Sequence, residues 1–155
     1  MICKKLKAFL DEHRIRYVVV SHSSAYTARE VAASVHVAGK DVVKCVMVSA
    51  DARPWMVAMT SNQRLNLDKL RAALGAENVR LEHESEFKPT FEDCEVGAMP
   101  PFGNLYGIPV IADGMLWDDD EIVFNGGSHT TVVRMSFADY HRLVSPRKAS
   151  IADPA

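Results

Sequence analysis

Two apolar runs in the first half of the chain constrain its fold more than any other feature of the sequence. Residues 42–48 and 55–59 are rich in β-branched and large apolar side chains, and residues 51–54 between them are of the turn-forming kind. Such runs separated by a short turn are typical of an antiparallel hairpin. Because both faces of the first run are apolar, we expect other parts of the chain to cover the hairpin on both sides.

Helical periodicity predicts helices at residues 2–13, 27–35, 66–74 and 136–143. Their ends carry suitable capping residues, namely Thr27 with Glu30, Asn66, Gly75 and Ser136. Further short strands are predicted at residues 17–20, 79–81, 110–112, 121–124 and 130–135. Since most neighbouring strands are joined by turns too short for a parallel crossover, we expect an α+β fold with a mixed, mainly antiparallel sheet flanked by helices.

Length and composition bound the class of protein. A chain of 155 residues with 48% hydrophobic and 25% charged residues is typical of one globular domain, which we assign to residues 1–146, with a polar tail at 147–155. No long apolar run or export signal is visible, so we expect a cytoplasmic protein without a membrane segment. A net charge of −2 argues against a protein that coats nucleic acid.

Lys44 is a charged residue inside the first apolar run. The period-2 alternation of a strand puts it on the same face as Val46 and Val48, while Cys45 points to the other face. Its ammonium must then reach a polar cleft or a partner, which would make it a functional residue. The alternative is that Lys44 lies near the strand end and extends into water.

Histidines and cysteines supply the other reactive side chains. His22 and His129 are each set among small polar residues, where a loop histidine can meet a substrate or is simply exposed. Neither the histidines nor the three cysteines have the short spacing of a metal site, so we expect no metal. Cys45 could pair with a histidine as a nucleophile, but a buried free cysteine is more often an apolar filler.

The segment Gly97-Ala98-Met99-Pro100-Pro101-Phe102-Gly103 combines glycines with prolines. Glycine allows close backbone approach and proline fixes φ, so this segment suits a rigid loop that presents N–H groups to an oxyanion or carboxylate. A plain structural turn is the alternative. The pair Gly126-Gly127 allows the same two interpretations.

In order and spacing, several motifs resemble those of the YbaK/ProX family of aminoacyl-tRNA deacylases, which is related to the editing domain inserted in prolyl-tRNA synthetases. The resemblance covers nearly the whole chain. It rests on the 27–32 segment, on Lys44 in its apolar strand, and on the segments Arg64-Leu65-Asn66-Leu67-Asp68-Lys69-Leu70, 97–103, Ile108-Pro109-Val110-Ile111-Ala112-Asp113 and Phe124-Asn125-Gly126-Gly127-Ser128-His129.

The resemblance implies a sheet curled into a partial barrel, with the aminoacyl end of the substrate between sheet and loops. Lys44 matches the essential lysine of the family, and Gly97 and Pro101 match its GxxxP motif, whose backbone helps to form the aminoacyl pocket. His129 falls where related editing domains have a polar or histidine residue next to a glycine. The implied catalytic residues are therefore Lys44, Gly97 and His129. Cys45 follows the lysine at a position that helps to set specificity. The remaining implied substrate-binding residues are His22, Thr27, Val46, Met99, Phe102, Gly127 and Ser128.

The implied activity is hydrolysis of the ester bond of a mischarged tRNA in trans, without cofactor or metal. The expected substrate is a proline-type tRNA carrying alanine, cysteine or another small amino acid, bound by its acceptor end, and prolyl-tRNA synthetase is a further expected partner. DNA and membranes are not expected partners. The sequence leaves open which amino acid and tRNA are used, whether water or a ribose hydroxyl attacks, and the oligomeric state.

Two alternatives belong to other classes of protein. The same pocket could bind aminoacyl-tRNA or an amino acid without turnover, with Lys44 as an anchor, and measured release of the amino acid separates this binding module from an enzyme. A general nucleic-acid-binding protein is the second alternative, which tight binding to uncharged DNA at physiological salt would support.

Overall fold

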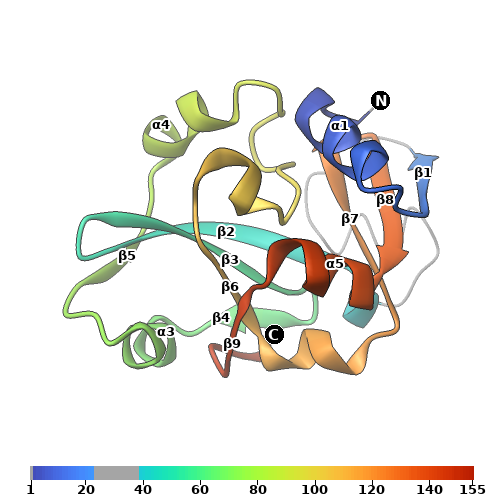
Figure 1. The fold of residues 1–155 in the computed structure, drawn as a ribbon. Coiled ribbons are helices and arrows are strands. Elements are labelled where there is room, and N and C mark those ends of the chain that lie inside the picture. The colour runs from blue at the N-terminus through green and yellow to red at the C-terminus, as the bar shows by residue number, and fades with distance from the viewer. Residues whose placement is uncertain (1, 23–38) are drawn as a thin grey trace.

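The computed structural model describes residues 2–22 and 39–155, which form three small sheets with short helices around them (Figure 1). The strands are β1 (Tyr17–Ser21), β2 (Val43–Ala50), β3 (Arg53–Thr60), β4 (Gln63–Leu65), β5 (Val79–Leu81), β6 (Val110–Asp113), β7 (Glu121–Ser128), β8 (Thr131–Ser136), β9 (Arg147–Ala149) and β10 (Ala152–Pro154). The α-helices are α1 (Lys4–Glu12), α3 (Leu67–Leu74), α4 (Glu84–Phe87) and α5 (Phe137–Val144). Short 3-10 helices are η1 (Gly39–Asp41), η2 (Lys88–Phe91), η3 (Gly103–Tyr106) and η4 (Gly114–Asp118).

The predicted hairpin forms the centre of the largest sheet, whose strand order is β5-β2-β3-β6-β9. Its turn is tighter than the predicted 51–54: only Asp51 and Ala52 lie outside the strands, and both have positive φ, 48° and 65°, as a two-residue hairpin turn requires. Pro54 is a residue of β3 and lies opposite Ser49. Pro54 is tolerated because β6 pairs with β3 only from Met56 onward, so no partner strand needs the missing N–H.

Parallel and antiparallel pairs are mixed in this sheet, which confirms the predicted fold class. β2 pairs antiparallel with β3 and β5, whereas β6 pairs parallel with β3, and β9 pairs parallel with β6. A second sheet of order β1-β8-β7 is antiparallel and crosses the end of the hairpin (Figure 1). A parallel bridge between Val42 and Val123 joins the two sheets, which meet there without closing into a barrel.

The C-terminal segment 147–155 is not the predicted polar tail but part of the sheets. β9 extends the largest sheet beside β6, and β10 pairs antiparallel with β4. Ile151, between them, is fully buried in the same cluster as Val57 and Ile111. The prediction was wrong because strands this short depend on pairing and on one buried anchor, not on an apolar alternation that can be seen in the sequence.

The predicted helix ends are confirmed where the structure describes them. The side chain of Asn66 accepts from the Lys69 N–H at 3.0 Å, and Ser136 Oγ accepts from the Asp139 N–H at 3.1 Å. Gly75 ends α3 with a φ of 62°. The predicted helix at 27–35 lies outside the described residues. Within 2–22 and 39–155, no helix is long and apolar enough to cross a membrane.

The largest sheet separates two apolar clusters. The main core contains Val43 and Met47 from one face of β2, together with side chains of α1, α5 and β7. The smaller core contains Val48 from the other face of β2, with side chains of β3, α3 and β6. Cys45 packs against the main core and Val46 against the smaller core. The alternation predicted for this strand is therefore confirmed.

A buried carboxylate ties the C-terminal segment to the sheets. Asp113 Oδ1 accepts hydrogen bonds from the N–H groups of Ile151 and Ala152 at 3.0 and 3.2 Å. Its Oδ2 accepts from the Met115 N–H at 3.1 Å and from Gln63 Nε2 at 2.9 Å. Asp113 is only 3% exposed, and these four donors compensate for its lost hydration. β4, β6, η4 and the C-terminal segment thus share one acceptor.

Replacing Asp113 with alanine is expected to lower the free energy of unfolding by about 3–5 kcal/mol, because several buried donors lose their acceptor. Urea unfolding followed by circular dichroism measures the loss. Asp153→Ala is the matched control: Asp153 forms a partly exposed ion pair with Lys69, so its replacement should cost much less. Equal losses in the two variants would contradict the role given to Asp113.

Candidate functional site

The turn between β7 and β8 packs against the loop that ends at residue 98. We call this region the glycine corner and define it as residues 95–98 and 126–129. The Glu95 N–H donates to the Gly127 carbonyl at 2.7 Å, and the Gly127 N–H donates to the Ala98 carbonyl at 3.0 Å. Gly127 has a φ of 109°, and a Cβ added there would lie 2.9 Å from that of Cys3. Both its backbone angle and its close neighbour therefore require glycine.

His129 belongs to this corner and is only 6% exposed. Its backbone N–H donates to Glu95 Oε2 at 3.1 Å, and its ring Nε2 lies 2.7 Å from the Val96 carbonyl oxygen. Because a carbonyl oxygen can only accept, Nε2 carries the hydrogen in this bond. The imidazole is thereby held against the loop that leads to Gly97.

Gly97 lies directly against the His129 ring. A Cβ added at Gly97 would meet His129 Cε1 at 3.5 Å, which is ordinary contact, but the φ of 83° is one that other L-residues disfavour. Gly97 is exposed, and within the described part of the chain no hydrogen bond uses its N–H. The structure thus brings two of the predicted catalytic residues together and presents a backbone donor at the surface of the corner.

Lys44, the third predicted catalytic residue, lies in β2 opposite Met59. Its side chain is partly buried, and its Nζ donates a short hydrogen bond to the backbone carbonyl of Gln63 in β4. Of the two alternatives that the sequence left open, the structure favours the polar partner over extension into bulk water.

β2 and β7 run from a common point toward Lys44 and the glycine corner. That point is the parallel bridge between Val42 and Val123. At about 3.3 Å per residue, Lys44 lies about 7 Å beyond the bridge along β2, and Gly127 about 13 Å beyond it along β7. Because the two strands run in the same direction, Lys44 and the corner lie on the same side of the bridge.

Asn125 was not predicted as a site residue. It lies in β7 two residues beyond the bridge, level with Lys44, where the pairing of β7 with β8 shifts register before Ser128. Its Oδ1 is buried and has no hydrogen-bond partner among the described residues. An unpaired buried acceptor is costly, which makes Asn125 a candidate for ligand contact. The sequence feature that could have identified Asn125 is its place: an amide side chain in an apolar strand, directly before two glycines.

Other predicted substrate-binding residues line or brace the same turn. The His22 N–H donates to the Thr130 carbonyl at 2.8 Å, so His22 lies beside the β7–β8 turn. Ser128 Oγ lies 3.1 Å from Thr131 Oγ1, to which it donates, and so braces the turn from within. Thr27 lies outside the described residues.

Met99, Pro101 and Phe102 follow the glycine corner into the main core. Met99 is 6% exposed, and Phe102 is fully buried. The Phe102 ring centroid lies 5.3 Å from that of Tyr140, whose hydroxyl donates to the Pro101 carbonyl at 2.7 Å. These contacts fix the segment behind Gly97 against α5.

Cys45 and Val46, the next two residues after Lys44, are separated by the sheet. Cys45 packs with Met99 and Phe102 against the main core, whereas Val46 packs in the smaller core. Met99, Phe102 and Cys45 therefore lie around one cluster, and Val46 does not join them. Burial raises the pKa of the Cys45 thiol, so this side chain stays neutral and is unsuited to act as a thiolate nucleophile.

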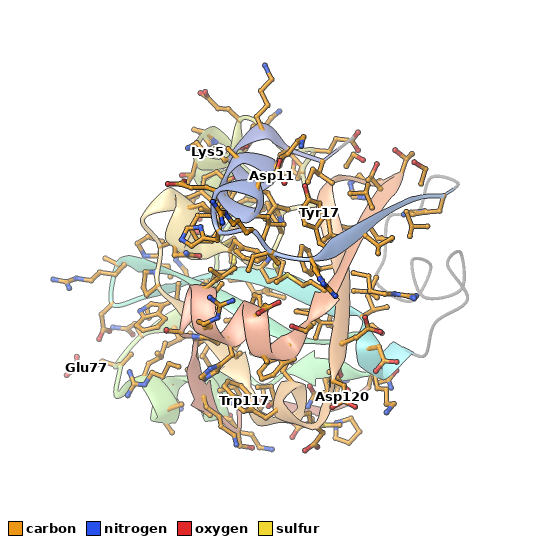
Figure 2. All side chains as sticks on the ribbon, turned by 45° about the vertical axis from the view of Figure 1, so that its right-hand side comes forward. Lys5, Asp11, Tyr17, Glu77, Trp117 and Asp120 are labelled. Carbon is orange, nitrogen blue, oxygen red and sulfur yellow. The ribbon has the colours of Figure 1, made fainter. Side chains whose placement is uncertain are left out.

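A charged pocket of about 370 Å³ opens at the start of β2. Its lining residues are Lys40, Asp41, Asp119, Asp120, Glu121, Val123 and Arg134. Asp120 lies near the lower end of the molecule in Figure 2. Burial, reinforced by the nearby charge of Asp41, raises the pKa of Asp119 to about 6. The pocket shares Val123 with the bridge between the sheets but not the glycine corner.

Among the described residues, one group has the composition and proximity of a metal site. The ligand atoms of Cys3, Asp93 and Cys94 all lie within 4.8 Å of one another. A hydrogen bond with the Cys94 thiol lowers the pKa of Cys3. Short spacing of ligands along the chain, the criterion applied to the sequence, predicts no metal. That criterion does not detect ligands that come together from distant parts of the chain.

Comparisons with known proteins identify relatives of this chain. The proline–tRNA ligase of Halalkalibacterium halodurans is 33% identical over 103 residues, which are 66% of this chain but only 18% of the ligase. The multifunctional Ser/Thr-tRNA deacylase ProXp-y of Escherichia coli K12 is 25% identical over 148 residues, covering 92% of this chain and 88% of that one.

Two solved structures share the fold. The hypothetical protein APE2540 has a TM-score of 0.86 at 20% identity and covers 97% of this chain and 100% of its own. A candidate trans-editing enzyme for prolyl tRNA synthetase has a TM-score of 0.83 at 20% identity, covering 97% and 96%. The family model described as the aminoacyl-tRNA editing domain matches residues 22–143, which is most of the chain. This chain therefore belongs to the aminoacyl-tRNA editing domain family.

Proposed function

We propose that this chain is an aminoacyl-tRNA deacylase that hydrolyses the ester bond of mischarged tRNA in trans. Family membership supports this activity, as does the Escherichia coli relative named as a Ser/Thr-tRNA deacylase, which aligns over most of both chains. The structural observation that carries the proposal is the exposed Gly97, whose N–H has no hydrogen-bond partner among the described residues and which lies against the buried ring of His129.

The reaction needs little chemistry from the protein. In the proposed step water attacks the ester carbonyl and a tetrahedral oxyanion forms. When the oxyanion collapses, the bond to the ribose oxygen breaks and a proton from the water passes to that oxygen, which releases the amino acid and the tRNA. Because the ester is already activated, positioning and oxyanion stabilisation supply most of the acceleration. In this proposal the Gly97 N–H is an oxyanion donor, and a backbone donor suits this role because the fold holds it in place before the substrate binds.

His129 acts through Gly97 in this proposal. Its ring is bonded to the Val96 carbonyl and packs against Gly97, so it sets the direction of the Gly97 N–H. We therefore assign His129 the role of a positioning residue.

Lys44 supplies a positive charge beside the reacting group. Its ammonium donates a hydrogen bond to the Gln63 carbonyl. The negative charge of an oxyanion or of a phosphate of the terminal nucleotide attracts this ammonium toward the substrate in the proposal. Lys44 thus acts as an electrostatic and orienting group, not as a nucleophile.

The substrate in this proposal is a proline-type tRNA, bound by its acceptor end, that carries a small amino acid such as alanine, cysteine or serine. The relatives named as proline–tRNA ligases support the tRNA type, although the chain spans only 18% and 15% of their lengths. Prolyl-tRNA synthetase is a further proposed partner, and the cytoplasm, where tRNA is charged, is the proposed location. In this proposal the residues that contact the amino acid are Cys45, which packs against the main core, and Met99, which belongs to it.

Lys44→Ala is expected to lower the deacylation rate at least about 100-fold, because it removes transition-state charge stabilisation. The measurement follows loss of the ester from separately prepared alanyl-, cysteinyl-, seryl- and threonyl-tRNAs, with circular dichroism as a check of the fold. Lys69→Ala, which removes an exposed ion pair with Asp153, is the matched control and should keep full activity. If wild-type protein released no amino acid faster than buffer, the chain would be a binding module, and the enzyme proposal would be wrong.

Gly97→Ala is expected to lower activity at least about tenfold, because an L-residue moves the backbone away from a φ of 83° and turns the N–H. Gly75→Ala is the matched control: Gly75 also has a positive φ, 62°, and nothing lies within 4 Å of an added Cβ. Both variants should lose about 1–2 kcal/mol of stability, but only Gly97→Ala should lose activity. Equal activities in the two variants would remove Gly97 from the mechanism.

Cys45→Ser is expected to change the relative rates for different aminoacyl-tRNAs more than it changes stability, because it puts a hydroxyl into an apolar wall at nearly constant volume. Rates for the four aminoacyl-tRNAs, compared as ratios, measure the effect. Val46→Thr, on the opposite face of the same strand, is the control and should leave these ratios unchanged. Unaltered ratios in Cys45→Ser would show that Cys45 is a core residue only.

A further inference from the structure

We propose that Cys3, Cys94 and Asp93 form a binding site for a thiophilic divalent metal ion, with Zn²⁺ as the best match to their chemistry. Cys3 is the N-cap residue of α1, and the other two residues lie in the loop between η2 and the glycine corner. Their ligand atoms all lie within 4.8 Å of one another. The proposed deacylation does not use any of the three.

The spacing within the group fits a tetrahedral ion. Zn–S and Zn–O bonds of about 2.3 and 2.1 Å at a tetrahedral angle put the sulfur and the oxygen about 3.6 Å apart. Cys94 Sγ lies 3.7 Å from Asp93 Oδ1. These two ligands therefore need almost no movement to share one ion. Two thiolates, one carboxylate and a water would complete four ligands.

Tyr106 orients the ligands from outside the group. Its hydroxyl donates to Asp93 Oδ1 at 2.8 Å and lies 3.5 Å from Cys94 Sγ. Lys5 Nζ lies 4.7 Å from the centroid of the Tyr106 ring, and Figure 2 shows Lys5 on α1 at the top of the molecule. Metal ligands in proteins are typically fixed by such outer hydrogen bonds. The carboxylate is thus held toward the thiols before any ion arrives.

The site is both anchored and accessible. The Cys3 N–H donates to the Gly126 carbonyl at 2.7 Å, and Glu95, next to Cys94, donates to the Gly127 carbonyl at 2.7 Å. Cys3 and the residue that follows Cys94 are therefore bonded to two neighbouring glycines of β7. Cys3 is buried and Asp93 is exposed, so an ion enters from the carboxylate side.

Binding would release the two thiol protons to solvent and leave a site with one net negative charge. The N-terminus of α1 favours a thiolate at Cys3, since its partial positive charge lies next to the sulfur. A bound ion would join α1 to the loop that leads into the glycine corner. The proposed role of the ion is therefore structural.

The test uses the reduced full chain and Co²⁺ as a spectroscopic probe for Zn²⁺. We expect one equivalent of Co²⁺ to produce the thiolate charge-transfer and tetrahedral d–d absorption bands, Zn²⁺ to displace it, and Zn²⁺ to raise the melting temperature of the wild-type protein. Cys94→Ser and Cys3→Ser should abolish the charge-transfer band. Tyr106→Phe, which keeps all three ligands, should weaken Zn²⁺ binding about 10–100-fold.

Cys45→Ser is the matched control, because it removes the remaining cysteine without touching the group, and it should bind Co²⁺ as the wild type does. Asp93→Asn changes an exposed side chain, so it tests the site even if the cysteine variants fail to fold, and it should weaken binding at least about tenfold. Absence of the absorption bands in reduced wild-type protein would overturn the proposal. So would equal binding by wild type and Asp93→Asn, or a Cys3–Cys94 disulfide whose reduction does not restore Co²⁺ binding.

Discussion

The hydrogen bonds of the buried Asp113 carboxylate support both the fold and the position of Lys44. The carboxylate holds the side chain of Gln63, and the backbone carbonyl of Gln63 accepts the ammonium of Lys44. The same carboxylate holds the N–H groups of Ile151 and Ala152, which bring β10 beside β4. The Lys44 ammonium thus donates to the backbone of Gln63, and the side chain of Gln63 is fixed by the Asp113 carboxylate, whose two oxygens both accept hydrogen bonds. Buried charges persist in proteins when all their hydrogen-bonding positions are used in this way.

Much of the fold could be predicted from the sequence, because local signals and tertiary pairing agree over most of the chain. The alternation in β2 placed Lys44 and Cys45 on opposite faces correctly, and Asn66 and Ser136 cap helices as predicted. The C-terminal strands were not predictable. Their residues are mostly polar, and they are ordered by the acceptor on Asp113 and by the buried Ile151, neither of which has a signature within the segment itself.

The site was predictable only in part, because its residues come from distant segments. Family resemblance selected Gly97 and His129, and the structure brings them into contact, but no spacing rule relates two residues so far apart. Asn125 is marked by an unpaired buried oxygen, a property that exists only after folding. The group of Cys3, Asp93 and Cys94 likewise exists only after folding. Cys3 and Cys94 come together because Cys3 is bonded to Gly126 of β7 and Glu95, the residue after Cys94, is bonded to Gly127.

The alternation of β2 separates two properties that an editing enzyme must control. Lys44 faces one side of the sheet and takes its position from Gln63, whereas Cys45 faces the other side and packs against the main core. A substitution at Cys45 can therefore alter the shape or polarity of one wall without moving the lysine ammonium on the opposite face. In the proposed mechanism, neighbouring positions in one strand therefore separate the residue that would shape the amino-acid site from the residue that would supply the charge.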